Sequence, residues 1–204
     1  MCEFVLYYSM GVEVMENSEK LMNAMRLGRV YRRQELAEFS TSVDRDLKTL
    51  VESGRVKKLS GGLYCRPRLN AFGSTPPEEK DLVQAFLKTN DFLLTSYSHF
   101  NQFGLGLTQV YNHYVVYNHK RTGEYTLGGK RFKFLMVPAY PKKLCKEFLL
   151  VDLLNNLKRL PDNTSSVREN LKSRWDDFDG NKVGAYLDRY GKAGAKEFLR
   201  EVHA

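Results

Sequence analysis

Apolar and polar residues near the start of the chain alternate with a helical period. Between residues 33 and 39 the apolar side chains fall on one face of a short predicted helix. A longer helix is predicted from Val43 to Ser53, where apolar residues recur at i, i+4, i+7 and i+8 and form one stripe. Gly54 ends this helix, because glycine tolerates the left-handed conformation that helix C-caps need.

The residues on either side of this second helix also have a local pattern. Ser40, Thr41 and Ser42 precede it, and their hydroxyl groups can accept hydrogen bonds from the free N–H groups of its first turn. After it, two β-rich runs at 56–59 and 63–66 flank a Ser-Gly-Gly turn. Such a pattern is typical of a β-hairpin.

Two more predicted elements come before this group. A helix is expected from Asn17 or Ser18 to about Leu27, and Val30-Tyr31 can form a short strand that pairs with the hairpin. The order is then helix, strand, helix, helix and two strands. This order predicts a winged helix-turn-helix over residues 16–68.

The rest of the chain has the composition of a second domain. Residues 69–77 are rich in Gly, Ser and Pro and are expected to be a linker. Residues 78–204 predict a small antiparallel sheet with helices, including a hairpin at 125–137, an apolar helix at 145–159 and a last helix at 182–202. The predicted fold class is therefore α+β, with an N-terminal winged helix-turn-helix and a C-terminal mixed domain.

Residues 1–15 form an N-terminal extension to these domains. The first 14 are mostly apolar and include Glu3, but they lack the basic residues of a signal peptide. Our hypothesis is that they are either a translated upstream region or a strand used in packing.

Positive charge is concentrated in the predicted winged unit. Residues 26–68 hold 11 Lys/Arg and 5 Asp/Glu, a net charge of +6, whereas the whole chain carries +8. Dense positive charge on a compact unit favours contact with phosphates. We expect the second helix to enter the major groove of duplex DNA through Arg45, Lys48 and Thr49, with Thr41 and Ser42 beside it. The remaining candidate DNA contacts are Arg32 and Arg33, and Lys57, Lys58 and Arg66 of the hairpin, which would grip phosphates or the minor groove.

The sequence gives little support for a disulfide framework, a metal site or a catalytic site. Three cysteines without CxxC spacing favour reduced thiols in a cytoplasm over a disulfide framework or a zinc site. The four histidines lack metal-ligand spacing, and no phosphate-binding glycine loop or catalytic triad is present. We therefore expect no enzyme activity, no cofactor and no metal. Asp152 lies inside an apolar helix, where a structural hydrogen bond to an arginine or a backbone amide is favoured over a functional role.

Several segments together resemble one known family. They are GGLYCRPR at the end of the hairpin, LLTSYSHFNQFGL, YTLGGKRFKF, EFLLVDLLNNLKRL, and the closing VGAYLDRYG with EFLREV. In this order, from about Glu16 to the C-terminus, they resemble the AbiEi-type antitoxins and transcriptional regulators of abortive-infection toxin–antitoxin pairs. None of these segments is catalytic.

The resemblance implies a cytoplasmic phage-defence protein with two roles. The winged helix would bind operator DNA in its own promoter and repress it, as a monomer or a DNA-assisted dimer. The C-terminal antitoxin domain would antagonise a cognate nucleotidyltransferase-like toxin, with or without direct contact. No membrane partner is implied.

Two alternatives remain open from the sequence. One is a ligand-sensing winged-helix repressor whose C-terminal domain binds a metabolite. The other is a protein-interaction module without affinity for DNA. Salt-dependent binding to duplex DNA separates the antitoxin-repressor and the ligand-sensing repressor from the protein-interaction module.

Overall fold

The computed structural model describes residues 17–71, 73–160 and 166–203. The described residues form two compact units: those up to 90 together with 126–130, and those of 91–125 together with those from 131 onward. The N-terminal extension at 1–15 lies outside the described residues.

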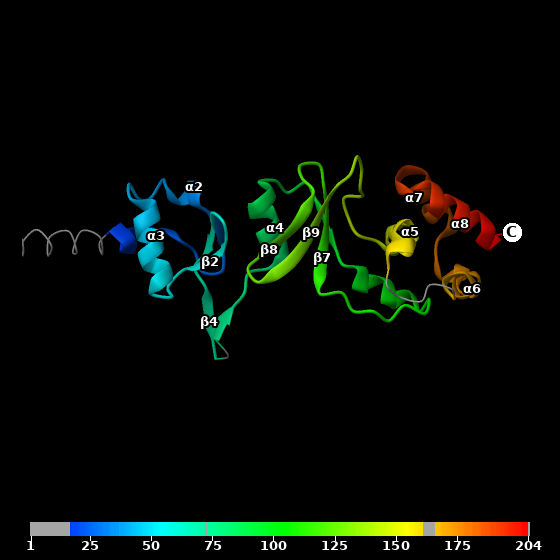
Figure 1. Cartoon of the computed structure of the whole chain (residues 1–204), viewed down its shortest axis with the longest axis horizontal. Coiled ribbons are helices and arrows are strands. Elements are labelled where there is room, and N and C mark those ends of the chain that lie inside the picture. Colours follow the sequence, from blue (N-terminus) through cyan, green and yellow to red (C-terminus); the bar gives the residue numbers. More distant parts are fainter. Residues whose placement is uncertain (1–16, 72, 161–165, 204) are drawn as a thin grey trace, which may run out of the picture. The chain divides into compact units, whose positions relative to one another are not determined.

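The N-terminal unit contains three helices around one small core before its hairpin (Figure 1). They are the helix at 17–24, α2 (Arg33–Leu36) and α3 (Val43–Glu52). The predicted helix at 43–53 is confirmed, with the apolar stripe facing inward, and Gly54 follows it with a φ of +73°. Leu21, Leu36, Leu47 and Leu50 are almost fully buried in this core.

A three-stranded sheet completes this unit. Its strands are β1 (Val30–Arg32), β2 (Lys57–Ser60) and β3 (Leu63–Cys65), in the spatial order β1-β3-β2 and all antiparallel. The predicted hairpin is thus confirmed as β2–β3. Tyr31 lies opposite Tyr64 and both pack against the helical core, whereas Val30 and Cys65 occupy the opposite face. Helix α4 (Glu79–Leu87) packs against β1, so the sheet lies between helices.

The structure divides the chain differently from the sequence-based boundary. Residues 69–77 were expected to be a linker, but they contain most of the hairpin of β4 (Arg68–Asn70) and β5 (Gly73–Thr75). Helix α4, which was assigned to the second domain, belongs to the first unit. The physical reason is burial: its residues Leu82, Val83 and Leu87 are at most 2% exposed.

The C-terminal unit is built around a four-stranded mixed sheet. The strands are β6 (Leu93–Thr95), β7 (His113–Asn118), β8 (Gly123–Leu127) and β9 (Lys130–Met136), in the order β6-β7-β9-β8. The hairpin predicted at 125–137 is confirmed as β8–β9. The sheet is not purely antiparallel as expected, because β9 rather than β8 lies beside β7 and the two run parallel.

Helices and short 3₁₀ turns supply the other part of this core. They are η1 (Tyr97–Phe103), α5 (Lys146–Asn156), η2 (Leu157–Arg159), α6 (Val167–Ser173), η3 (Trp175–Asp177), α7 (Gly180–Tyr190) and α8 (Ala193–His203). Helix α5 is buried almost all round and packs against α7 and α8. The single last helix expected at 182–202 is wrong, because the chain leaves the helical conformation at Gly191 and two helices result.

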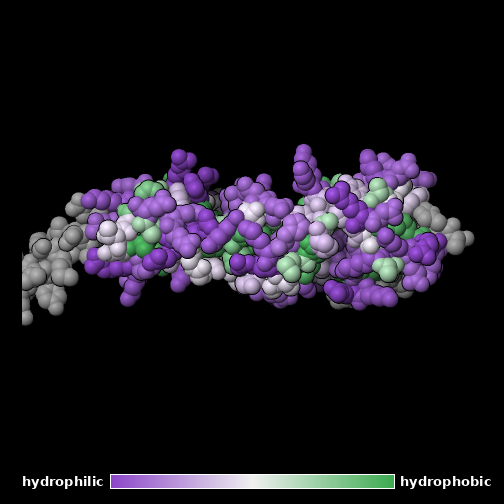
Figure 2. Space-filling model, turned by 90° about the horizontal axis from the view of Figure 1, so that it is seen from above, coloured by the Kyte–Doolittle hydropathy of each residue, from purple (hydrophilic) through white to green (hydrophobic). Residues whose placement is uncertain are grey.

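The surface shown in Figure 2 is mostly hydrophilic, with small scattered apolar areas. Leu69 and Val110 are exposed apolar residues of the kind that most proteins carry. Among the described residues, no helix combines the length and the apolar character needed to cross a membrane.

Candidate nucleic-acid interface

Helix α3 presents a polar face opposite its buried stripe. Val43, Leu47 and Leu50 point into the core, which turns Arg45 and Lys48 outward. Both cations are exposed. The Lys48 ammonium lies 3.9 Å from Glu52, a loose pair on the helix surface, and Arg45 has no polar side-chain partner in the part of the chain that the structure describes. These two residues are therefore available to an external anion.

The turn before α3 is held by a hydrogen-bond chain that differs from the expected cap. Ser42 is the N-cap residue, but its hydroxyl makes no capping bond. Instead the Ser40 hydroxyl donates to buried Asp46 at 2.5 Å and accepts from the Ser42 N–H at 3.0 Å. Thr41 is exposed beside this turn. These hydrogen bonds fix the residue at which α3 begins, and therefore the direction in which its polar face points.

Thr49 is the third residue that was expected to read the groove. It is half-buried, and its hydroxyl donates to the Arg45 carbonyl at 3.2 Å. This bond within the helix can be exchanged for one to a ligand, since a hydroxyl rotates freely.

Two candidate arginines already hold carboxylates. Arg33 makes a bidentate pair with Asp44, with N···O distances of 2.8 and 2.5 Å, and this pair links α2 to the first turn of α3. The guanidinium raises the acidity of its partner, so the pKa of Asp44 lies below its ordinary value. Arg32 donates to Glu35 at 2.9 and 2.7 Å. Their charge is largely neutralised by these pairs, so both arginines are less available to an external anion than the sequence indicated.

Arg66 is occupied by the fold itself. Its guanidinium donates to the carbonyls of Met22 and Met25, at 3.0 and 3.3 Å, near the end of the helix at 17–24. The Met22 carbonyl also accepts from the Met25 N–H at 3.1 Å, and Met25 lies just beyond the helix, so the arginine adds a charged donor at the helix end. The structure therefore places Arg66 among the groups that join the helix to the sheet, and not on the exposed hairpin.

Lys57 and Lys58 are both exposed on β2, which is an edge strand. Neither has a side-chain partner within the described ranges. Neighbouring residues of a strand point to opposite faces. Lys58 lies opposite Tyr64, on the face that packs against the helices, whereas Lys57 lies opposite Cys65, on the face toward α4.

The sequence reasoning counted Arg26 and Arg29 only in the net charge. Both are exposed and lie at either end of the turn between the first helix and β1. The signal that could have found them is their spacing around Gly28, whose φ of +78° marks a tight turn. Like Arg45, Lys48, Lys57 and Lys58, they are exposed cations of this unit that hold no bidentate carboxylate.

The C-terminal unit contains a buried polar group, centred on Asp152. Asp152 is 3% exposed and accepts from the Tyr117 hydroxyl at 2.6 Å and from the Asn156 side-chain amide at 2.9 Å. The partners are thus a tyrosine and an asparagine, not the expected arginine or backbone amide. Burial raises the pKa of Asp152 to about 6. Burial also raises the pKa of the Tyr117 hydroxyl, which therefore remains a donor.

The histidines have local contacts. The Nδ1 atom of His99 lies 3.2 Å from the Thr95 hydroxyl, and the ring of His119 stacks on Tyr140. In the described part of the chain, no three His, Cys, Asp or Glu side chains are grouped in a way that could hold a metal ion.

Comparisons with protein-family models, with curated proteins and with solved structures each give no match to this chain.

Proposed function

We propose that the N-terminal unit is a winged helix-turn-helix that binds duplex DNA, with α3 in the major groove. The observation that carries this proposal is the exposed polar face of α3, where Arg45 is without a partner among the described residues and Lys48 is held only loosely. A guanidinium can bind a guanine edge or a phosphate with two hydrogen bonds. The short side chains of Thr41 and Thr49 allow the helix to approach a groove closely.

The order of elements supports the same proposal. A helix, β1, α2, α3 and the hairpin β2–β3 follow one another in the N-terminal unit. The bidentate pair between Arg33 and Asp44 holds α2 against the start of α3. A rigid pair of helices is what positions a recognition helix, because its polar face must keep one orientation as it meets the groove.

The resemblance to AbiEi-type antitoxins extends this proposal from DNA binding to a biological role. The chain would repress its own toxin–antitoxin operon in the cytoplasm, and its C-terminal unit would antagonise a nucleotidyltransferase-like toxin. The resemblance alone supports this second activity.

A mobility-shift titration with the DNA upstream of the gene tests the DNA-binding role. The double variant Arg45→Glu/Lys48→Glu is expected to lose binding, because two attractive contacts become repulsive ones. The matched control is Lys172→Glu/Arg200→Glu, which reverses the same number of exposed charges on α6 and α8. Retained binding by the α3 variant, or equal loss in the control, would contradict the assignment of α3.

Co-expression with the neighbouring toxin gene tests the antitoxin role separately. We expect the α3 variant to rescue growth although it no longer represses the operon, since the two activities belong to different units. If wild-type chain does not rescue growth, the antitoxin role fails while the DNA-binding role stands.

A further inference from the structure

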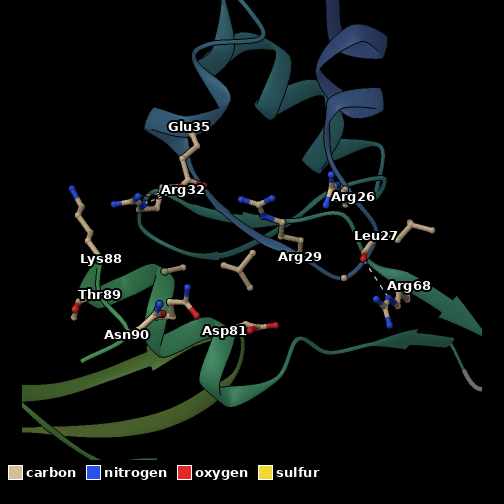
Figure 3. Close-up of a pocket in the computed structure, with 14 residues that line it drawn as sticks. Arg26, Leu27, Arg29, Arg32, Glu35, Arg68, Asp81, Lys88, Thr89 and Asn90 are labelled. Atoms are coloured by element: carbon tan, nitrogen blue, oxygen red, sulfur yellow. Dashed lines mark hydrogen bonds and ion pairs between the residues drawn. The ribbon is translucent and has the colours of Figure 1, made fainter. Parts of the chain in front are cut away.

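A cavity of ≈ 640 Å³ lies within the N-terminal unit, on the sheet face that α4 covers. Figure 3 shows it between the turn that leads into β1, helix α4 and Arg68 of β4. This volume falls in the range of pockets for small-molecule ligands. None of the residues proposed to read the major groove lines the cavity, so it is a separate site.

The lining of this cavity is cationic. Arg26, Arg29, Arg32, Arg68 and Lys88 line it, against the two carboxylates of Glu35 and Asp81. The ion pair between Arg32 and Glu35, in which two guanidinium nitrogens donate to one carboxylate oxygen, cancels one charge of each sign. A surplus of positive charge therefore remains around the cavity, and it favours an anionic ligand.

The free donors of this lining come from two arginines. The Arg26 side chain has no polar partner among the described residues, and Arg29 lies with its guanidinium 4.8 Å from the centre of the Tyr31 ring. The Tyr31 hydroxyl accepts from the Arg26 backbone N–H at 2.9 Å, so one buried residue fixes both ends of the turn. Each guanidinium keeps a planar fork of donors that matches a phosphate.

The third arginine reaches the cavity because of a glycine. Arg68 donates from Nε to the Leu27 carbonyl at 3.3 Å, which leaves its terminal N–H groups available to a ligand. A Cβ atom on Gly28 would lie only 2.7 Å from Arg68 Nε. Glycine at this position therefore allows the arginine to lie across the turn.

We propose that this cavity binds a small phosphate-bearing anion of the nucleotide or polyphosphate class. Arg26, Arg29 and Arg68 would hold the phosphates. Asp81 and Gln84 on α4 would accept hydrogen bonds from hydroxyl or amino groups of a nucleoside, since a carboxylate disfavours a bare polyanion. This inference does not depend on the proposed DNA binding.

Isothermal titration of the full-length protein with inorganic phosphate, pyrophosphate and ATP at constant ionic strength tests the proposal. The variant Arg26→Gln/Arg29→Gln is expected to bind pyrophosphate or ATP at least about tenfold more weakly, because charged hydrogen bonds are lost. Lys172→Gln/Arg200→Gln removes two exposed charges elsewhere and should leave the affinity unchanged. Circular dichroism confirms that both variants keep their fold.

The outcomes separate the ligand sources. Tighter binding of ATP than of pyrophosphate supports a nucleotide, and equal binding supports a free polyphosphate. If no anion binds the wild-type chain, or if the cavity variant keeps full affinity, the proposal is overturned. It is also overturned if only duplex DNA binding weakens in the cavity variant, since the arginines would then belong to a nucleic-acid surface. Failure of the DNA-binding proposal is recognised separately, because it is tested by the mobility shift of the Arg45→Glu/Lys48→Glu variant.

Discussion

Arginine side chains of the N-terminal unit serve different physical purposes. Arg33 and Arg66 hold groups of the protein itself, a carboxylate and two carbonyls respectively. Arg45 projects from α3 without such a partner in the described structure. All three look alike in the sequence as cations of the predicted winged unit. The sequence predicts the density of charge, but only the tertiary contacts decide which cations remain available.

The difference between these arginines can be measured as the change in the free energy of unfolding when each is replaced. Arg66→Gln is expected to lower the free energy of unfolding by about 1–3 kcal/mol, because two carbonyls at the helix end lose a charged donor. Arg45→Gln is expected to change it by less than about 0.5 kcal/mol, as is usual for exposed positions. Urea denaturation of both variants provides the measurement. Equal stability of the two variants would contradict the structural role of Arg66.

Asp152 is the second residue whose environment is unusual. One carboxylate oxygen accepts from Tyr117 and Asn156, while the buried Oδ2 atom has no hydrogen-bond partner. Burial raises the pKa of this carboxyl from 3.8 to about 6. Since the folded state holds its proton more tightly than the unfolded state, the contribution of Asp152 to stability falls as pH rises from about 4 to about 6.

Asp152→Asn removes this titration but keeps an oxygen that accepts from Tyr117. The free energy of unfolding of the variant relative to wild type should therefore increase between pH 4 and pH 7, by up to about 3 kcal/mol for a pKa difference of about 2. Urea denaturation at several pH values measures this change. The matched control Asp188→Asn, at an exposed position of α7, should show a flat difference. A flat difference for Asp152→Asn as well would mean that its carboxyl titrates normally.

At the scale of elements, β2 turns two adjacent lysines to opposite faces of the sheet. Lys58 shares the face of Tyr64 and of the helices, while Lys57 shares the face of Cys65. Only Lys58 is thus on the same side of the sheet as α3. The sequence placed both lysines in one group, because adjacency along the chain hides the alternation of a strand.

This alternation gives a matched pair of variants. Lys58→Gln is expected to weaken duplex binding several-fold and to reduce its salt dependence by about one unit of the log–log slope, as for one lost phosphate contact. Lys57→Gln should have a smaller effect on both. Fluorescence anisotropy with a labelled duplex measures the two variants under the same conditions. The reverse order of effects would show that the other face of the hairpin meets DNA.

Elements with a strong local pattern could be predicted from the sequence. Helix α3 has a regular apolar stripe, and both hairpins contain glycine turns between β-rich runs. The split between α7 and α8 could not be predicted, because apolar spacing continues through Gly191 while the backbone turns there. The parallel pairing of β7 with β9 depends on a contact between distant residues, which no local pattern encodes.

At the scale of the whole molecule, the boundary between the units depends on packing and not on composition. Proline and glycine near residues 73–77 predicted a linker, yet α4 beyond them buries its apolar face in the N-terminal unit. The tip of the β8–β9 hairpin joins the same unit, and the Gly128 N–H donates to the Leu59 carbonyl at 2.9 Å. A piece of sequence from the second half thus completes the first unit.

Tertiary packing also explains why the candidate interface could be predicted only in part from the sequence. Charge density pointed to the N-terminal unit, and α3 of this unit exposes Arg45 and Lys48 to solvent. The cavity beside α4 was missed because its arginines come from the turn before β1 and from β4, which are far apart in the sequence. Such a gathering depends on the fold and leaves no contiguous motif.

The central claim is that the exposed cations of α3 and β2 bind the phosphates and bases of a double helix. Its most direct test is the affinity of the full-length chain for duplex DNA from its own upstream region, measured from low to high salt. We predict that the logarithm of the association constant falls linearly with the logarithm of salt concentration, with a slope of about −3 for the three contacts of Arg45, Lys48 and Lys58, and that Arg45→Gln/Lys48→Gln makes this slope shallower. An affinity that is independent of salt, or the same slope in the variant, would contradict the account.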